Sequence, residues 1–128
     1  MERVRGVGGV FLRAKDKEKL LEWYRDHLGI EFEEWGGVVF QWKNEQSPHR
    51  SGSTTWSIFD RDTEYFGPKT SSCMVNYRVE DLGKMLDQLR TAGVEVDEKV
   101  EASEYGRFGW AVDHDGNRIE LWEPPEGM

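Results

Sequence analysis

The chain has 128 residues, of which 37% are hydrophobic and 33% charged, and its formal net charge is −8. This length is sufficient for a single domain that buries its own core. Acidic residues outnumber basic ones by 25 to 17, which argues against a nucleic-acid partner. No apolar run approaches the roughly 20 residues of a membrane span and no signal-peptide core is present. We therefore expect no membrane partner and a cytoplasmic location.

The first half of the chain predicts a strand, a helix and three further strands. Residues 4–13 alternate as a strand, and residues 17–28 form an amphipathic helix with Asp16 as N-cap and Gly29 as the stop. Residues 30–35 and 38–43 read as a hairpin that turns at Gly36-Gly37. Residues 44–53 read as a lid-like loop that holds His49, and residues 54–59 as a strand.

The second half repeats this order. Strand 71–79 precedes a helix that starts at Leu82 and ends at Ala92-Gly93, and strands 94–100, 106–112 and 117–122 follow. The segment that starts at Arg13 aligns with the one that starts at Arg78, 65 positions later. We therefore predict a single domain over residues 1–128 made of two βαβββ modules, module one at about 1–62 and module two at about 70–125.

The last strand places one carboxylate, Glu120, on a polar face. Asp115-Gly116-Asn117 is a tight-turn signal, and after it Ile119 and Leu121 alternate with Arg118, Glu120 and Trp122. One face of this strand is therefore apolar, and the other carries a charge pair beside a tryptophan.

These segments together resemble the vicinal oxygen chelate superfamily, the glyoxalase/bleomycin-resistance/dioxygenase proteins. The resemblance rests on the stretch from Phe11 through Trp23-Tyr24 to Leu28-Gly29 and on the stretch from Asp113 to Trp122. It implies an α+β fold in which two tandem βαβββ modules form a curved mixed sheet, a cup that holds the ligand. It also implies a homodimer.

The resemblance also implies where a metal would bind. In the metal enzymes of the family, one ligand lies on the first strand and one on the fourth strand of each module, and these positions fall on Gly9, Ser57, Met74 and Glu120. Only Glu120 suits a hard divalent ion, since glycine offers no ligand atom and a thioether prefers soft metals. We predict no metal ligands and no cofactor. A divalent metal is the alternative, with His49 as a replacement ligand.

Side chains that share the face of Glu120 are the candidate ligand-binding residues, because side chains alternate across a strand. With the neighbouring Trp56 added as a fluorescent reporter, the candidates are Phe11, Arg13, Trp56, Ser57, Phe59, Met74, Asn76, Arg78, Arg118 and Trp122. This mixture of aromatic, amide and charged groups is typical of a small-molecule site. An ion pair between Glu120 and Arg78 or Arg118 is the structural alternative.

Three functional hypotheses follow. The first is a metal-independent protein that binds a small organic molecule in an aromatic-lined cup. The second is an enzyme of the same fold, a lyase, isomerase or dioxygenase, which uses non-standard metal ligands or Glu120 as catalytic general base in a dry site. The third is a structural or regulatory dimer module, which leaves the polar face of the last strand unexplained.

Overall fold

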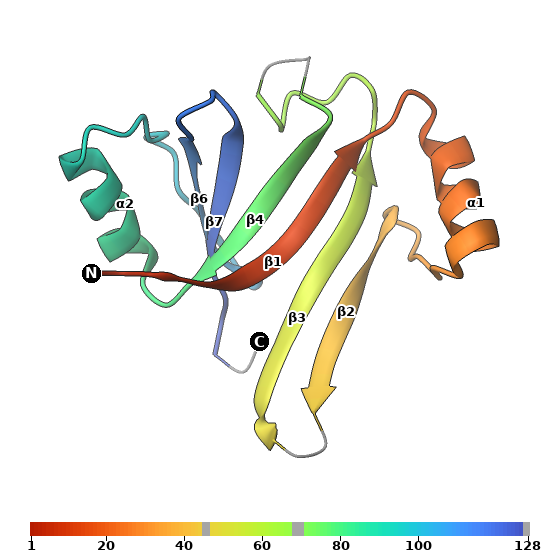
Figure 1. Cartoon of the computed structure of the whole chain (residues 1–128), viewed down its shortest axis with the longest axis horizontal. Coiled ribbons are helices and arrows are strands. Elements are labelled where there is room, and N and C mark those ends of the chain that lie inside the picture. The colour runs from red at the N-terminus through yellow and green to blue at the C-terminus, as the bar shows by residue number, and fades with distance from the viewer. Residues whose placement is uncertain (45–46, 68–70, 127–128) are drawn as a thin grey trace. The chain divides into compact units, whose positions relative to one another are not determined.

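The computed structural model describes residues 1–44, 47–67 and 71–126 (Figure 1). Its elements, in order, are β1 (Val4–Arg13), α1 (Lys17–Leu28), β2 (Gly37–Asn44), β3 (Ser47–Phe59), β4 (Cys73–Val79), α2 (Leu82–Thr91), β5 (Glu101–Ser103), β6 (Gly106–Val112) and β7 (Arg118–Glu123). They form two compact units. The N-terminal unit is Gly9–Met74, and the C-terminal unit combines Met1–Gly8 with Val75–Met128.

The N-terminal unit packs α1 on a sheet with the order β2-β3-β1. β1 runs parallel to β3, from Gly9 opposite Thr55 to Arg13 opposite Phe59. The side chain of Asp16 caps α1 by accepting a hydrogen bond from the backbone N–H of Lys19 at 3.2 Å, and Gly29 ends the helix with a φ of 66°. Both predicted helix ends are therefore confirmed.

The core of the N-terminal unit lies between α1 and β3. Its buried residues are Ala14, Leu21 and Ile58, against which partly buried side chains such as Tyr24 and Trp56 pack. The rings of Tyr24 and Trp56 meet edge to face at 4.9 Å. Burial of this apolar stripe of α1 provides the main stabilisation of the helix, because a helix of this length is marginal alone.

The C-terminal unit places α2 against a sheet with the order β4-β7-β6-β5. β4 runs parallel to β7, whereas β6 is antiparallel to both β7 and β5. The core beneath α2 consists of Val79, Leu82, Met85, Leu86, Ala111 and Leu121. Each unit thus combines a helix with strands of mixed direction, as the α+β prediction required.

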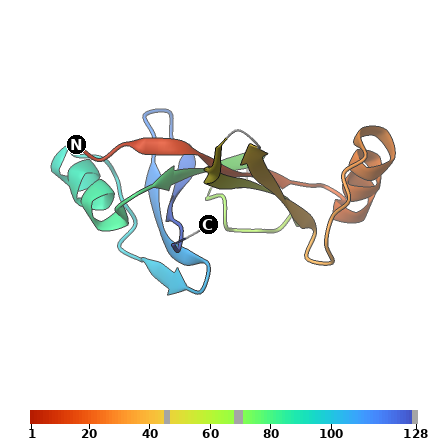
Figure 2. The ribbon, with the colours of Figure 1, turned by 90° about the horizontal axis from the view of Figure 1, so that it is seen from below.

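The first residues of the chain belong to the C-terminal unit and lie beside α2 in both views (Figures 1 and 2). The backbone N–H of Glu2 donates to Oε1 of Gln88 at 2.9 Å, and Nε2 of Gln88 donates to the carbonyl of Glu2 at 3.3 Å. Arg5 pairs with Glu80 at 3.0 Å. The N-terminal end of β1 is therefore held by a helix that follows much later in the sequence.

The predicted strand at residues 30–35 is wrong. These residues form a connection and a turn, in which the N–H of Gly36 donates to the carbonyl of Glu33 and the N–H of Glu33 donates to the carbonyl of Gly37. Gly36 has a φ of 91°, and Gly37 is the first residue of β2. Both polar backbone groups of Glu33 are used in this turn, so they are not available for a strand ladder.

The predicted lid-like loop at residues 44–53 is also wrong for residues 44 and 47–53, and residues 45 and 46 lie outside the described part of the chain. β2 and β3 instead form a long hairpin that pairs Asn44 with Ser47 and Trp42 with Gly52, and His49 lies in β3. Pro48 and Gly52 suggested a loop, but a register shift between Trp42 and Asn44 relaxes the ladder near Pro48. The ring of Trp42 fills the space that a side chain at position 52 would need. Glycine is therefore required within this strand.

The predicted strand at residues 94–100 is reduced to one isolated bridge, between Val96 and Ala111. Backbone hydrogen bonds from Asp97 to Trp110 and from Val112 to Glu95 fix this segment beside β6, but regular pairing begins only with β5. Strands β6 and β7 lie where the sequence predicted them, to within one residue.

Within the described ranges, no helix is both long enough and apolar enough to cross a membrane.

Candidate ligand site around Glu120

Glu120 is buried at the centre of the C-terminal unit's sheet, with 1% of its surface exposed. It lies on β7 opposite Asn76 of β4 on one side and opposite Trp110 of β6 on the other. Nδ2 of Asn76 donates to Oε2 at 2.7 Å, and Nε1 of Trp110 donates to Oε1 at 3.1 Å. Each carboxylate oxygen therefore accepts a hydrogen bond from a neighbouring strand, which offsets the desolvation of the group.

The strand alternation that the sequence predicted for β7 is confirmed. Leu121 belongs to the core beneath α2, and Ile119 packs against that core. Since successive side chains point to opposite faces of a strand, Glu120 and Trp122 lie on the sheet face away from α2. We call Asn76, Arg78, Trp110, Glu120 and Trp122 the Glu120 cluster.

Trp122 is fixed on three sides. Its Nε1 donates to the carbonyl of Tyr105 at 2.8 Å, and its ring stacks on Phe108 with centroids 6.1 Å apart and planes at 13°. The guanidinium of Arg78 lies over the ring at 5.3 Å. Burial lowers the pKa of Arg78 from its ordinary value, because desolvation penalises the charged form. A cation over an indole face recovers part of that desolvation.

Arg118 forms its ion pair with Asp97, between Nη1 and Oδ2 at 3.4 Å, and its guanidinium lies 5.2 Å from the ring centroid of Trp110. The pKa of Asp97 is lowered, first by a backbone hydrogen bond from Lys99 and then by Arg118. Arg118 therefore covers one face of the Trp110 ring, and the indole N–H of the same ring donates to Glu120.

One polar atom of Asn76, its Oδ1, accepts no hydrogen bond from the residues that the structure describes. Asn76 itself is 3% exposed. Gly8 lies against this oxygen, since a Cβ at position 8 would overlap Oδ1 and lie 2.8 Å from Cε3 of Trp122. The absence of a side chain at position 8 is therefore what allows Asn76 to reach Glu120.

Two of the remaining sequence-predicted site residues, Phe11 and Phe59, belong to an aromatic group in the N-terminal unit. Phe59 contacts the ring of Phe11 at 5.6 Å, stacks on Tyr65 at 5.5 Å and meets Phe66 at 5.2 Å. The guanidinium of Arg13 lies over Phe66 at 5.4 Å. Phe66 was not predicted as a site residue, because its loop carries no periodic pattern.

Ser57, Met74 and Trp56 also belong to the N-terminal unit. Ser57 and Met74 are buried. Trp56 packs in the core beside α1 and therefore lies on the strand face opposite to Ser57. Within the C-terminal unit, Trp110 is the contributor that the sequence prediction missed. In the β6–β7 hairpin, whose turn contains Gly116, Trp110 lies opposite Glu120. The hairpin register was therefore the sequence signal that could have identified Trp110.

The residues at the four metal-ligand positions do not fit a hard divalent ion. At Gly9 the ring of Phe11 and the carbonyl of Thr55 would lie 2.9 and 3.0 Å from a Cβ, so no ligand side chain fits there. Met74 offers only a thioether, and both oxygens of Glu120 face N–H donors. Among the described residues, no three His, Cys, Asp or Glu side chains form a metal-binding group. The side chain of His49 lies outside the described part of the chain.

Comparison with known proteins identifies the family. The model of the Glyoxalase/Bleomycin resistance protein/Dioxygenase superfamily matches residues 6–121, and the chain belongs to this superfamily. The resemblance and the glyoxalase/bleomycin-resistance fold that the sequence predicted are thereby confirmed. No protein of curated function matches this chain significantly.

Several solved structures share the fold. Methylmalonyl-CoA epimerase from Mycobacterium tuberculosis is 24% identical, with a TM-score of 0.63 over 95% of this chain and 89% of that one. A variant of the Streptomyces coelicolor methylmalonyl-CoA epimerase in complex with 2-nitronate-propionyl-CoA is 15% identical, with a TM-score of 0.66 over 93% and 96%. A superfamily member from Vibrio splendidus is 14% identical, with a TM-score of 0.57 over 94% and 97%.

Proposed function

We propose that this protein binds a small organic ligand at the Glu120 cluster, without the metal of the family's enzymes. The observation that carries the proposal is Oδ1 of Asn76, a buried acceptor to which no group in the described part of the chain donates, beside the buried carboxylate of Glu120. A buried polar group without a partner is destabilising by about 1–3 kcal/mol. A ligand that supplies an N–H or O–H donor would remove this penalty.

The surroundings of Asn76 indicate the rest of the ligand. The buried rings of Trp110 and Trp122 are the apolar neighbours of Glu120, and the partly buried guanidinium of Arg78 provides N–H donors. Small-molecule sites combine mainly apolar walls with a few placed polar groups. We therefore expect a compact molecule with an unsaturated ring, a hydrogen-bond donor for Asn76 and an oxygen acceptor for Arg78.

Intrinsic tryptophan fluorescence tests this proposal. A panel of neutral ring compounds, including phenols, anilines and cyclic amides, is titrated into the protein, and a saturable change is expected for those with both a donor and an acceptor. Trp122→Phe should remove most of the change, whereas Trp35→Phe, which alters an exposed tryptophan of the N-terminal unit, should preserve it. A panel without any saturable response contradicts the proposal.

Catalysis by Glu120 is the alternative function. A general base must offer an oxygen to the proton that it removes, and each oxygen of Glu120 already accepts from an N–H donor of a neighbouring strand. This geometry favours binding over proton abstraction. Methylmalonyl-CoA, which one structural neighbour holds, provides the test. Deuterium incorporation into this thioester in D₂O, catalysed by the wild type and lost in Glu120→Gln, would support the alternative.

We also propose that the protein is a homodimer, and the edge of the N-terminal unit supports this. β2 is the last strand in the order of that unit's sheet, and it exposes Val39, Phe40 and Trp42. An exposed apolar edge strand favours association with another chain. Light scattering should give twice the chain mass of 14.9 kDa. Phe40→Lys should reduce the mass to that of a single chain, and an unchanged wild-type value near 15 kDa contradicts the homodimer.

A further inference from the structure

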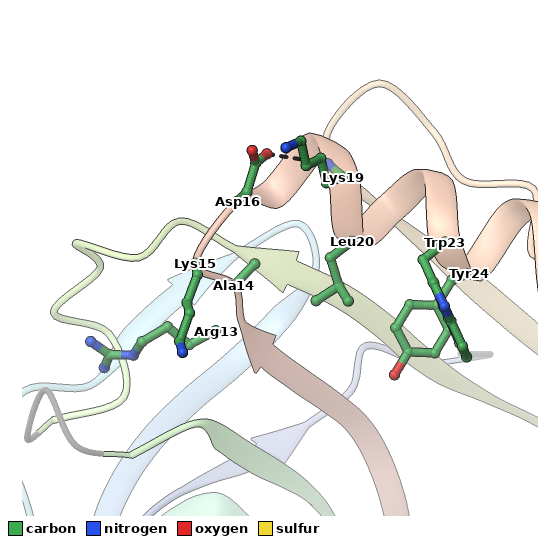
Figure 3. A pocket seen from close by; sticks show the side chains of 8 residues that line it. All are labelled: Arg13, Ala14, Lys15, Asp16, Lys19, Leu20, Trp23 and Tyr24. Carbon is green, nitrogen blue, oxygen red and sulfur yellow. Dashed lines mark hydrogen bonds between the residues drawn. The ribbon is translucent and has the colours of Figure 1, made fainter.

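A hollow of about 520 Å³ lies in the N-terminal unit where β1 ends and α1 begins (Figure 3). Its lining includes the cationic side chains of Arg13, Lys15 and Lys19 and the apolar or aromatic side chains of Leu20, Trp23 and Tyr24. None of its residues belongs to the Glu120 cluster, so the hollow is a separate feature of the molecule.

The hollow carries an excess of positive charge in a chain whose net charge is −8. Among the described residues that line it, three side chains are cationic and one, Asp16, is acidic. Oδ1 of Asp16 already accepts from the N–H of Lys19, so the attraction for an anion comes from the side chains and not from the capped helix end. Arg13 is held in place by a 3.3 Å hydrogen bond to the carbonyl of Arg61.

The other end of the hollow is aromatic. The ring of Trp23 is 50% exposed and meets the ring of Tyr24 edge to face at 5.2 Å. In Figure 3, Arg13 and Lys15 lie on the side of the β1 end, Trp23 and Tyr24 lie on the helix side, and Leu20 lies between them. The hollow therefore presents Arg13 and Lys15 on the side of β1, Lys19 beside Asp16 at the start of α1, and the aromatic rings of Trp23 and Tyr24 further along the helix.

Comparison of the two repeated modules shows that the combination of lysine and aromatic side chains occurs at the start of α1 and not at the start of α2. Asp81 caps α2 as Asp16 caps α1, by accepting from the N–H of Lys84 at 2.9 Å. With the same offset, Lys15 corresponds to Glu80 and Trp23 corresponds to Gln88. The second module thus retains the helix cap without the paired lysines and without the tryptophan. The cap alone does not require these residues.

We propose that this hollow binds a small aromatic anion, with its ring on Trp23 and Tyr24 and its carboxylate or phosphate beside Lys15, Lys19 and Arg13. Stacking on an exposed indole and attraction to two lysines are separate contributions, so a ligand needs both parts to bind well. Both carboxylate and phosphate suit lysine as a point charge. The inference does not depend on ligand binding at the Glu120 cluster.

The test compares phenyl phosphate, benzoate, inorganic phosphate and benzyl alcohol by calorimetry and tryptophan fluorescence. Phenyl phosphate or benzoate should bind saturably, and the tighter of the two identifies the head group. Inorganic phosphate and benzyl alcohol should each bind at least about tenfold more weakly, because each lacks one part of the ligand. Raising the salt concentration from about 0.02 to 0.2 M should weaken binding, since exposed charges are screened.

Variants locate the site. Lys19→Gln should weaken binding about fivefold, and Trp23→Phe should abolish the fluorescence change. Lys84→Gln is the matched control, because Lys84 occupies the same position of α2, and it should bind like the wild type. Trp122→Phe should also leave the response intact. Absent binding of both aromatic anions, equal binding of inorganic phosphate, or equal weakening by Lys84→Gln would each overturn the proposal. Melting temperatures of the lysine variants confirm that they remain folded.

Discussion

Asn76 of β4 and Glu120 of β7 are register partners in a parallel strand pair, and their side chains share a 2.7 Å hydrogen bond in an interior where neither is more than 3% exposed. Glu120→Ala would leave two buried N–H donors without an acceptor, on Asn76 and Trp110. We expect it to lower the free energy of unfolding by about 3 kcal/mol. Urea denaturation measures this change.

Glu120→Gln, compared with Glu120→Ala, tests whether Asn76 can adapt to a changed hydrogen-bond partner. The amide of the glutamine can place its N–H group opposite Nδ2 of Asn76, which is also a donor. Asn76 can then rotate its own amide so that Oδ1 accepts from the glutamine. We therefore expect a loss of only about 1 kcal/mol. Equal losses for Glu120→Ala and Glu120→Gln would contradict a role of Asn76 as an adaptable partner.

Gly8→Ala tests the close approach beneath Asn76. The added methyl group would overlap Oδ1 of Asn76 and press on Trp122, so we expect a loss of about 1–3 kcal/mol. Gly83→Ala in α2 is the matched control, because the nearest atom to its new methyl group lies at 3.5 Å. This control should be neutral or stabilising by about 0.5–1 kcal/mol. Destabilisation by both substitutions to the same degree would contradict the specific packing at Gly8.

Asp113 should contribute a pH-dependent part of the stability. Its carboxylate accepts from the N–H of Asp115 and from both the N–H and Nδ2 of Asn117, which lowers its pKa, with the backbone bond from Asn117 as the largest cause. A lowered pKa stabilises the fold above the unfolded value near 3.9, and this stabilisation is lost as the pH falls further.

Thermal melts of Asp113→Asn between about pH 2.5 and 7 provide the measurement. The variant should melt below the wild type at neutral pH, and the difference should shrink below about pH 4. Asp115→Asn, which removes the same charge two residues away, is the matched control for the loss of a charge. A constant difference across the range would refute the linkage.

Gly52→Val tests the corrected β2–β3 hairpin. A side chain at position 52 would overlap the ring of Trp42, which must then move or the strands must separate. We expect a loss of about 1–3 kcal/mol and a changed near-ultraviolet circular dichroism signal from the tryptophan. Gly52→Val combined with Trp42→Ala should be less destabilised than the sum of the single variants. If residues 44–53 were a loop, both single changes would be nearly neutral.

Local signals predicted much of the fold. The caps at Asp16 and Gly29 and the turn at Gly116, whose φ is 88°, depend on neighbouring residues and were predicted correctly. The role of Gly52 depends on Trp42 across a strand pair, which no local pattern contains. The error at residues 30–35 has a different cause, because Glu33 is satisfied by a local turn with Gly36 and Gly37 that the strand-like residue pattern did not reveal.

The candidate site was predictable only in part. The alternation of side chains along each strand correctly placed Glu120, Asn76 and Trp122 on the same face of neighbouring strands. It did not show that Trp110 supplies the second donor, because that requires the β6–β7 register. The alternation of side chains along a strand does not show which charged groups form ion pairs, so the pairing of Arg118 with Asp97 could not be predicted.

The division of β1 between the two units has a consequence for biosynthesis. The whole N-terminal unit, Gly9–Met74, is available once Met74 has been synthesised, whereas the C-terminal unit combines residues 1–8 with residues 75–128. Domains generally fold as they emerge from the ribosome. We expect the N-terminal unit to form first, while residues 1–8 remain accessible to proteases until translation has supplied Glu80 and Gln88, the residues that hold them.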